Sequence, residues 1–383
     1  MKVLIVCNNY YGKGNGLAAS ARTTTKYLKE AGIDVRVISA VNPDPQGSQP
    51  DYPLQQFHFP IFQPLIEKQT YCFAHADQKV IEKAVEWADI MHLEDPFPLQ
   101  NRVAKEARKR GKPCVGTFHM YPENITSTLF MRHWKLGNYL LLQWFNRMNY
   151  RHCSHIQCPT QNVVDRLTAN HFKGRLHLIP NGMVNTDRCE GNIKLETDPY
   201  LILAIGRYSV EKGLPTLLKA MKYTKYADRI QLCFAGKGPC EWKLRRAATK
   251  LVKEGILKHE PWFRYCSQQE LGELSSQAYL YIHCAFIEVE GLSCLEALRH
   301  ATVPVIAQGR YTATSQFSLH EQSVFPIFDA KALAQRIDWW IEHPEERERM
   351  GAKYAESVKS YAIQDSIKAL INMYQAALDE QKR

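Results

Sequence analysis

Short apolar runs rich in β-branched residues alternate with longer amphipathic stretches along the chain. The first run, KVLIVC (2–7), is followed by the glycine-rich segment NNYYGKGNG, a helical pattern over 17–32 and a second run at 35–39. Further runs occupy residues 88–93, 113–118, 155–160 and 175–180, and helical patterns cover 76–87 and 97–110. Residues 41–75 show little periodicity. Strands that alternate with helices in this way predict a doubly wound α/β domain with a parallel sheet.

The same cycle begins again at Tyr200. The run YLILAIG (200–206) precedes the loop RYSVEKG and a helical pattern over 214–223, and further runs lie at 230–239, 280–286 and 303–307. The polar, turn-rich residues 189–199 predict a linker between the two cycles. Helical patterns over 329–342 and 344–379 close the sequence. We therefore predict an α/β protein with two Rossmann-like, doubly wound lobes facing across a cleft.

Composition is that of a globular protein in a reducing compartment. The 383 residues are 45% hydrophobic and 23% charged, enough for two domains of ordinary size. The eleven cysteines form no C-x-x-C pair, and the apolar start MKVLIVCNNY is too short for a signal peptide. No run reaches the roughly 18 apolar residues of a membrane span. We expect a cytoplasmic protein whose cysteines are mostly small core residues.

The net charge of +10 is unevenly distributed. Residues 1–190 carry 23 Lys and Arg against 16 Asp and Glu, a balance of +7. Such a balance favours an anionic partner, namely nucleic acid, a phosphate ligand or a membrane surface, although it also serves solubility.

Two charged motifs stand out in the second half. In EVEGLSCLEAL (288–298), Glu288 and Glu296 flank a predicted helix start near Gly291. A helix N-terminus favours phosphate, and carboxylates on either side of it suit hydroxyl groups, so the pattern matches a nucleotide sugar. In GRYSVEKG (206–213), Arg207 and Lys212 follow a strand and could reach a diphosphate. Taken singly, these residues could equally be surface charges.

GRYSVEKG, FAGKGP, EVEGLSCLEAL and VPVIA, in this order and spacing, resemble a retaining family-4 glycosyltransferase of the GT-B fold. The N-terminal half fits through its glycine-rich first loop, FHMYPEN (118–124), CPTQNVVDRL and IPNG. The resemblance implies an acceptor-side lobe over 1–190, a nucleotide-sugar lobe over 191–360 and a helix over 361–383 that returns to the N-terminal lobe. It also implies hexosyl transfer with retention of configuration and without a metal or other cofactor.

The family pattern also assigns roles to single residues. It places Glu296 on the ribose diol, Glu288 on hydroxyls of the donor sugar, and Arg207 and Lys212 on the diphosphate. Backbone N–H groups near Gly291 and Leu292 also face the diphosphate. Gly14 and Gly16 lie where members approach the donor phosphate or the acceptor. His119 matches a histidine beside the bond being broken, although by itself it reads as a strand-end histidine.

This sequence departs from the family pattern at three places. Glu290 stands where phenylalanine is frequent, Val184 where aspartate is common, and HATV (300–303) lacks the usual glycine. The charged site residues are kept, so we expect an active enzyme.

The acceptor is predicted from the N-terminal half. Residues 129–151 are aromatic-rich and carry several cations, and KEARKRGK (105–112) adds five more. We predict a peripheral protein at the inner face of an anionic membrane, with a UDP-sugar donor and a lipid or lipid-linked acceptor of the diacylglycerol or ceramide type. The alternative for the acceptor is a surface polysaccharide that the enzyme extends. The alternative for residues 129–151 is an ordinary core helix with solvated ends.

Three other readings are weaker. RHCSHIQC (151–158) could suggest zinc, but alternate residues of a strand point to opposite faces, so we predict no metal site. An NAD-dependent oxidoreductase needs G-x-G-x-x-G and an acidic residue about 20 positions on, whereas GKGNG is followed by no such residue. The basic clusters match no nucleic-acid-binding motif, so we expect no nucleic-acid partner.

Overall fold

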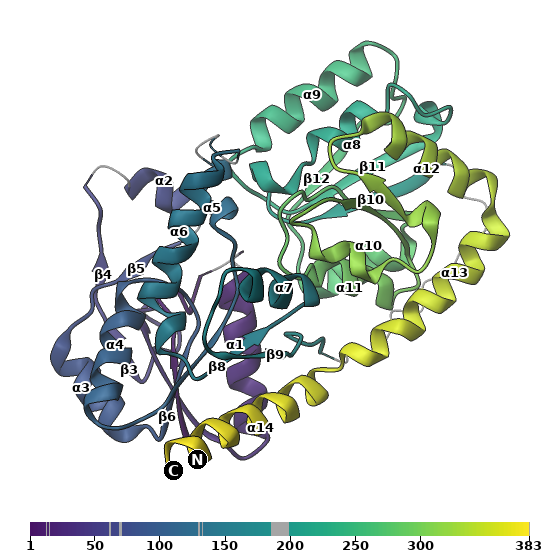
Figure 1. Cartoon of the computed structure of the whole chain (residues 1–383). Helices are drawn as coiled ribbons and strands as arrows, with labels where there is room; N and C mark the ends of the chain where they lie inside the picture. Colours follow the sequence, from purple (N-terminus) through teal and green to yellow (C-terminus); the bar gives the residue numbers. More distant parts are fainter. Residues whose placement is uncertain are drawn as a thin grey trace. The chain divides into compact units, whose positions relative to one another are not determined.

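The protein is described here by a computed structural model covering residues 1–12, 14, 16–60, 63–68, 71–128, 131, 133–184 and 199–382. The chain forms two compact units (Figure 1). Unit 1 comprises Met1–Pro122, Arg132–Gly182 and Ile363–Arg383, and unit 2 comprises Glu123–Met131 and Met183–Ala362. The predicted boundary at 190/191 and the predicted linker, apart from Pro199, lie outside the described residues.

Unit 1 is built on a parallel sheet in the order β3-β2-β1-β6-β7-β8-β9. Its strands are β1 (Lys2–Val6), β2 (Asp34–Ala40), β3 (Tyr52–Leu54), β6 (Ile90–Leu93), β7 (Cys114–Thr117), β8 (His155–Cys158) and β9 (Arg175–Leu178). Strand β1 lies inside the sheet, and its Val3 pairs with Val35 of β2 on one side and with Ile90 of β6 on the other. A short antiparallel pair, β4 (Gln56–Phe57) and β5 (Phe73–Ala74), is formed within the excursion over 41–75.

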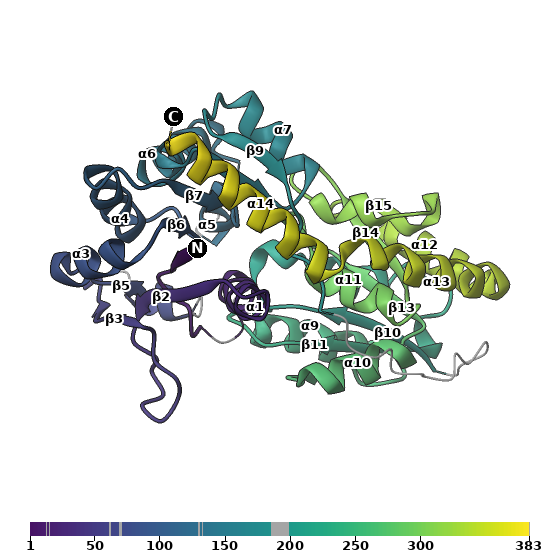
Figure 2. The same cartoon turned by 90° about the horizontal axis from the view of Figure 1, so that it is seen from below.

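Helices cover both faces of this sheet. On one face α1 (Gly16–Glu30) and α14 (Ile363–Gln381) pack together (Figure 2). Leu28 and Tyr374 join Val3 there in a buried apolar cluster. Leu4 and Val6 point to the other face by strand alternation, where α3 (Gln78–Trp87) and α4 (Pro98–Lys109) pack. The remaining helices of the unit are α2 (Gln63–Lys68), α6 (Lys135–Met148) and α7 (Gln161–Ala169).

Unit 2 has a parallel sheet in the order β12-β11-β10-β13-β14-β15. Its strands are β10 (Tyr200–Ile205), β11 (Ile230–Ala235), β12 (Trp262–Arg264), β13 (Leu280–His283), β14 (Val303–Gln308) and β15 (Val324–Pro326). The helices α8 (Pro215–Ala220), α9 (Glu241–Lys253) and α12 (Ala330–Glu342) group on one face. The helices α10 (Gln268–Gln277), α11 (Leu292–Arg299) and α13 (Pro344–Ser357) group on the other, and α5 (Pro122–Thr128) falls mostly in this unit. Two Rossmann-like α/β lobes are thereby confirmed.

The continuous helix predicted over 344–379 is wrong, because the chain breaks between α13 and α14. A short 3-10 turn, Val358–Tyr361, follows α13, and Ala362 is extended before Ile363 starts α14. The Tyr361 carbonyl oxygen accepts a hydrogen bond from Met183 N–H at 2.7 Å, and the Tyr361 ring packs against Phe317. This tertiary pairing replaces the helical hydrogen bonds at the break. Among the described helices, none is both long and apolar enough to cross a bilayer.

Candidate active site

The strand order of unit 2 places two loops together. Counted along the unit, the order is 3-2-1-4-5-6, and it reverses direction between β10 and β13. Loops that leave the carboxyl ends of strands at such a switch point diverge to opposite faces and form the usual ligand site of this fold. The loops after β10 and β13 do meet here, since Phe286 N–H donates to the Glu211 carbonyl oxygen at 3.0 Å.

Glycines are required where the backbones approach closely. Gly213 has φ +60°, and a Cβ there would lie 2.3 Å from the Cys284 carbonyl oxygen. Glycine at this position therefore lets the loop after β10 pack against the end of β13. A Cβ at Gly238 would lie 2.6 Å from the Tyr208 carbonyl oxygen. The backbone of Tyr208 is fixed to this second glycine segment by Tyr208 N–H to the Lys237 carbonyl oxygen, 3.0 Å. The glycines of VEKG and GKGP therefore shape the loop that carries Arg207 and Lys212.

Arg207 is held by a buried carboxylate. Its Nη2 lies 2.9 Å from Glu211 Oε1, which also accepts a hydrogen bond from Ser209 Oγ at 2.6 Å. The Glu211 side chain is buried, whereas the Arg207 side chain remains about one quarter exposed (26%). A buried carboxylate that bonds to one edge of a guanidinium fixes its orientation.

Lys212 and Glu288 lie in direct contact. Lys212 Nζ donates to Glu288 Oε2, and His283 Nε2 lies 3.5 Å from the same oxygen. Burial alone would raise the pKa of Glu288, but the positive charge of Lys212 and the hydrogen bond from His283 outweigh it and lower the pKa to about 2. Glu288 is therefore an ionised acceptor at neutral pH.

Gly291 starts the helix α11 in a left-handed conformation. Its φ is +97°, and a Cβ there would lie 2.4 Å from Thr314 Oγ1, so both backbone and space demand glycine. Leu292 is the first helical residue. The first N–H groups of a helix have no acceptor within it, which makes this turn suitable for an anion.

Glu296 lies one turn further along α11. Burial raises the pKa of its carboxyl group, against the smaller opposing effects of the Arg299 charge and a hydrogen bond from Gln268. The structure thus brings Lys212 into contact with Glu288, three residues before Gly291, and places Glu296 on α11. Arg207 lies on the same loop as Lys212, where it pairs with Glu211.

A second polar group lies in unit 1, at the carboxyl ends of β6 and β7. His119 Nε2 lies 2.6 Å from Glu94 Oε2, and the side chains of both residues are almost fully buried. His92 lies 3.9 Å from the other carboxylate oxygen. Burial would raise the pKa of Glu94, but His92 and His119 together lower it. Glu94 is therefore an ionised partner that fixes the His119 ring.

Sequence analysis names His119 from this pair but not Glu94. Glu94 was missed, although an acidic Glu-Asp pair directly after an apolar strand is a recognisable signal. Its neighbour Asp95 accepts hydrogen bonds from Asn8 N–H (3.0 Å) and the Tyr71 hydroxyl (3.1 Å), and burial raises the pKa of Asp95 to about 6.

The first glycine-rich loop is described only in part. Gly14 has φ +72°, a conformation that favours glycine, and Gly16 is the first residue of α1. If either glycine carried a Cβ, it would meet no atom of the described residues within 4 Å, its two chain neighbours left aside. Lys13 and Asn15 lie outside the described residues. The two glycines therefore leave the start of α1 open.

The cluster weighed for zinc does not converge on one point. His155 Nδ1 contacts His177 Nε2 at 2.7 Å, while Cys153 Sγ donates to Asn149 Oδ1 at 3.3 Å. Across the described ranges, His, Cys, Asp and Glu side chains form no group of three that could hold a metal ion.

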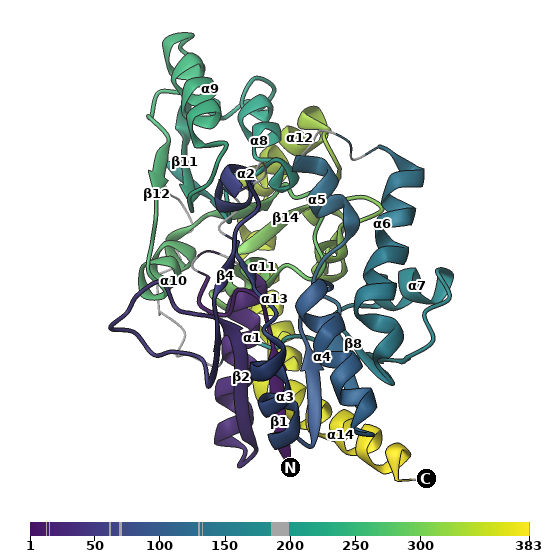
Figure 3. The same cartoon turned by 90° about the vertical axis from the view of Figure 1, so that its left-hand side faces the viewer.

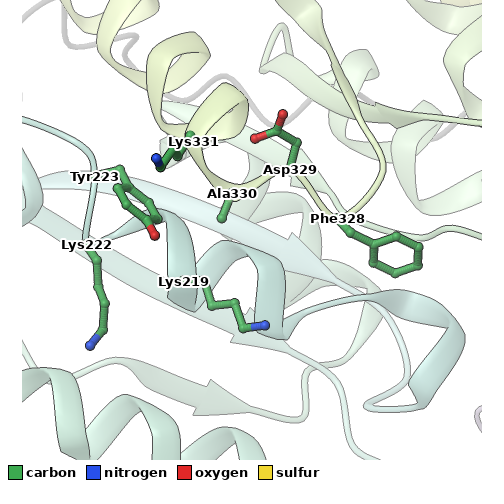
Figure 4. A pocket seen from close by; sticks show the side chains of 7 residues that line it. All are labelled: Lys219, Lys222, Tyr223, Phe328, Asp329, Ala330 and Lys331. Atoms are coloured by element: carbon green, nitrogen blue, oxygen red, sulfur yellow. The ribbon is translucent and has the colours of Figure 1, made fainter.

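A separate hollow of about 390 Å³ lies on unit 2, beside α8 and the start of α12. It is lined by Lys219, Lys222, Tyr223, Phe328, Asp329, Ala330 and Lys331. Figure 4 shows that the three lysine ammonium groups point in different directions. Lys222 is paired with Glu254, and Asp329 caps α12 through Ala332 N–H. The predicted site residues do not line this hollow.

Comparisons with known proteins identify the family and support the fold. A model of the family described as Glycosyltransferase Family 4 matches residues 14–188, and one described as Glycosyl transferases group 1 matches residues 187–357. The alpha-monoglucosyldiacylglycerol synthase of Streptococcus pneumoniae is 22% identical over 324 residues, which is 81% of this chain and 71% of that protein. The D-rhamnosyltransferase WbpZ of Pseudomonas aeruginosa is 27% identical over 157 residues, 40% of this chain and 39% of that protein.

Solved structures share the fold over nearly the whole chain. Sucrose-phosphate synthase from Thermosynechococcus elongatus superposes with a TM-score of 0.73 at 16% identity, covering 98% of both chains. Anabaena HepE, solved in complex with UDP-glucose, gives a TM-score of 0.71 at 15% identity, covering 97% of this chain and 99% of that one. The chain belongs to glycosyltransferase family 4, a family of retaining enzymes with the GT-B fold.

Proposed function

We propose that this glycosyltransferase takes a hexosyl group from a UDP-sugar and transfers it to a membrane lipid or lipid-linked acceptor. The donor part rests on the cations and helix start gathered at the β10/β13 switch point, and on the shared fold of HepE, which binds UDP-glucose. The acceptor part rests on one observation above all, an exposed apolar stripe on α6.

Each donor-binding residue has a proposed role. Arg207, Lys212 and the N–H groups near Gly291 and Leu292 bind the diphosphate, because cations and a helix start stabilise its charge. Glu288 accepts hydrogen bonds from hydroxyls of the donor sugar, and Glu296 does so from the ribose.

In unit 1, His119 lies near the sugar–phosphate bond, and Gly14 and Gly16 give the chain room beside the donor phosphate or the acceptor. These nine assignments are all part of the proposal.

The chemistry follows from the charges that develop during transfer. Cleavage of the sugar–phosphate bond leaves negative charge on the diphosphate, which Arg207, Lys212 and the start of α11 stabilise. Positive charge develops on the sugar, and the ionised Glu288 favours it. The acceptor hydroxyl oxygen bonds to the anomeric carbon on the face that the phosphate leaves, which retains the configuration without an enzyme nucleophile. The leaving phosphate oxygen takes the hydroxyl proton, so no enzyme base is needed.

The exposed stripe on α6 is apolar and aromatic. Leu136, Tyr139 and Leu140 are 62%, 51% and 54% exposed, and their spacing puts them on one face of the helix with Trp144. Trp134, at the start of the helix, is 52% exposed, and its indole lies against Gly137. Exposed Trp, Tyr and Leu on one helix face are typical of proteins that rest in the interfacial layer of a membrane.

The basic helix α4 packs against α6, the helix that carries this stripe (Figures 1 and 3). Burial first, and then the positive charges of Arg151, Arg108 and Lys105, lower the pKa of His152, which directly follows α6. Asn101 of α4 also donates to the Arg147 carbonyl oxygen at the end of α6. The arrangement suits an anionic lipid surface, where each cation contributes about 1 kcal/mol.

Only part of the basic segment 105–112 is available for such a surface. Lys109 and Arg110 pair with Glu106 at 3.2 and 2.9 Å. Lys112 Nζ donates to the carbonyl oxygens of Val85, Glu86 and Ala88 at the end of α3. Lys105 and Arg108 are therefore the better positions for a test of membrane binding.

Liposome flotation tests the acceptor surface. Wild-type protein should bind anionic vesicles and release them as salt rises. The double variant Leu136→Gln/Leu140→Gln should lower binding by roughly 30-fold, since about 2 kcal/mol of apolar burial is lost. Lys105→Glu/Arg108→Glu should weaken binding by a similar factor, and mainly at low salt.

Matched controls come from the same unit. Leu178→Gln changes a leucine that is also 54% exposed, and Lys83→Glu reverses an exposed charge on α3. Both should bind vesicles as wild type does. If the wild type ignores anionic vesicles at low salt and glycosylates soluble saccharides alone, the lipid acceptor is wrong and synthesis of a soluble or surface polysaccharide takes its place.

We also propose that transfer needs no metal ion. Two side-chain cations and a helix start already stand where a bridging ion would otherwise serve the diphosphate. Turnover of the UDP-sugar should therefore be unchanged by excess EDTA. A complete loss that magnesium or manganese restores would contradict this prediction.

A further inference from the structure

A row of hydrogen-bonding side chains runs beneath Glu288, inside unit 2. Tyr281 and His283 are two residues apart on β13, so their side chains share one face of the strand. The Tyr281 hydroxyl lies 2.9 Å from His283 Nδ1 and 3.1 Å from Ser293 Oγ in the first turn of α11. Tyr281 is fully buried and His283 is 3% exposed. The row joins the start of α11 to the carboxylate of Glu288.

The chemistry of the partners fixes where the protons lie. An ionised carboxylate only accepts, so the His283 nitrogen that faces Glu288, Nε2, carries the hydrogen. Thr314 Oγ1, 3.3 Å from Nε2, shares this hydrogen. His283 Nδ1 then accepts from the Tyr281 hydroxyl, whose oxygen accepts in turn from Ser293. Every donor in the row meets an acceptor with the imidazole neutral.

We propose that His283 is a positioning residue that holds the Glu288 carboxylate in the orientation needed to receive the donor sugar. The inference rests on the proposed function, because Glu288 is assigned to the sugar hydroxyls there. In the structure the Glu288 carboxylate contacts both Lys212 and His283. When a diphosphate draws the Lys212 ammonium toward itself, His283 is the partner that stays with Glu288.

A neutral donor suits this position better than a second cation. A cation would cancel the negative charge of Glu288, which favours the positive charge developing on the sugar. Burial lowers the pKa of His283, against the opposing effect of Glu288, so the ring stays neutral at neutral pH. The charged and titratable groups that face it are Glu288, Lys212 and Tyr281, and Thr314 is the uncharged neighbour.

Substitution of His283 tests the proposal by comparing turnover of the UDP-sugar with binding of UDP alone. His283→Leu should lower kcat/KM for the UDP-sugar by roughly 10- to 30-fold, while the Kd for UDP alone stays within about twofold of wild type. UDP lacks the sugar that Glu288 receives, so a general collapse of the site would weaken both. His283→Gln, whose amide N–H can replace Nε2–H, should recover most of the lost turnover.

Two results would overturn the proposal. One is a His283→Leu enzyme within twofold of wild type on the UDP-sugar. The other is a parallel loss of UDP binding and turnover in His283→Leu that His283→Gln does not restore. Thermal unfolding of both variants, recorded beside the assays, identifies a variant that fails to fold, and the glutamine variant then carries the comparison.

A measurement without substrate separates this inference from the proposed function. Nitrogen-15 NMR of the histidines in the full chain should show His283 neutral at pH 7 with its proton on Nε2, and Tyr281→Phe should disturb that signal. An imidazolium, or a proton on Nδ1, would overturn the hydrogen-bonded row. If the wild type turned over no UDP-sugar while the NMR result held, the proposed donor would be wrong and the row beneath Glu288 would stand.

Discussion

Lys212→Ala should lower kcat/KM for the nucleotide-sugar donor by roughly 30- to 1,000-fold. The Lys212 ammonium is proposed to bind the leaving diphosphate, and loss of a charge-assisted contact of this kind costs about 2–4 kcal/mol. The variant also removes the cation beside Glu288, whose low pKa depends on that charge. Glu296→Gln keeps the shape of its side chain and should lower the same constant in the same direction. Steady-state assays with a UDP-sugar measure both.

Lys222→Ala is the matched control for this experiment. Lys222 belongs to the same unit and forms a 3.1 Å ion pair with Glu254. The Lys222 side chain is 45% exposed and the Glu254 side chain 35% exposed. Exposed pairs of this kind contribute about 0–1 kcal/mol to stability, so the control should turn over donor as wild type does. If Lys212→Ala and Glu296→Gln both fold and keep near wild-type turnover, the donor site has been assigned to the wrong residues.

His119→Ala should lower kcat by roughly 100-fold, with a smaller change in KM. Loss of one positioned hydrogen-bonding group beside developing charge lowers kcat by about 10²- to 10³-fold. Glu94 holds the ring through the 2.6 Å contact to Nε2, so Glu94→Gln should lose part of the same factor by removing the charge. A stopped assay at saturating UDP-sugar, with each variant's folding checked by thermal unfolding, gives the comparison.

An exposed histidine of unit 1 provides the control for this second prediction. His58→Ala should leave kcat unchanged, because the His58 side chain is exposed and distant in sequence from β6 and β7. A His119→Ala enzyme with wild-type kcat would return His119 to the role of an ordinary strand-end histidine.

The long elements could be predicted from sequence because their periodicity is strong. Strands such as Lys2–Val6 and Tyr200–Ile205 are continuous apolar runs, as expected for parallel strands covered on both faces. The short strands β3, β12 and β15 were missed, since three residues each are too few to show alternation. The break before Ile363 was missed because it depends on a hydrogen bond from Met183, far away in the sequence.

The candidate site also contains residues that could be predicted from the sequence and residues that could not. Arg207, Lys212, Glu288 and Glu296 could be named because charged residues after apolar strands have a recognisable spacing. Their partners Glu211 and His283 were missed, because spacing alone does not say which carboxylate or imidazole meets them in the folded loops. A histidine inside the apolar run LYIHCAF was the available signal for His283. Buried polar groups need partners, so such a residue marks a place to look.

Incubation with UDP-, GDP- and ADP-hexoses, in the presence of anionic vesicles that contain diacylglycerol or ceramide, tests the central claim most directly. Mass spectrometry of the extracted lipids, with NMR of the anomeric proton, reports both the product and its configuration. The account predicts a hexosyl lipid formed from a UDP-hexose with the donor's configuration retained. A hexosyl product of inverted configuration, or no transfer to lipid and no hydrolysis of any nucleotide sugar, would contradict it.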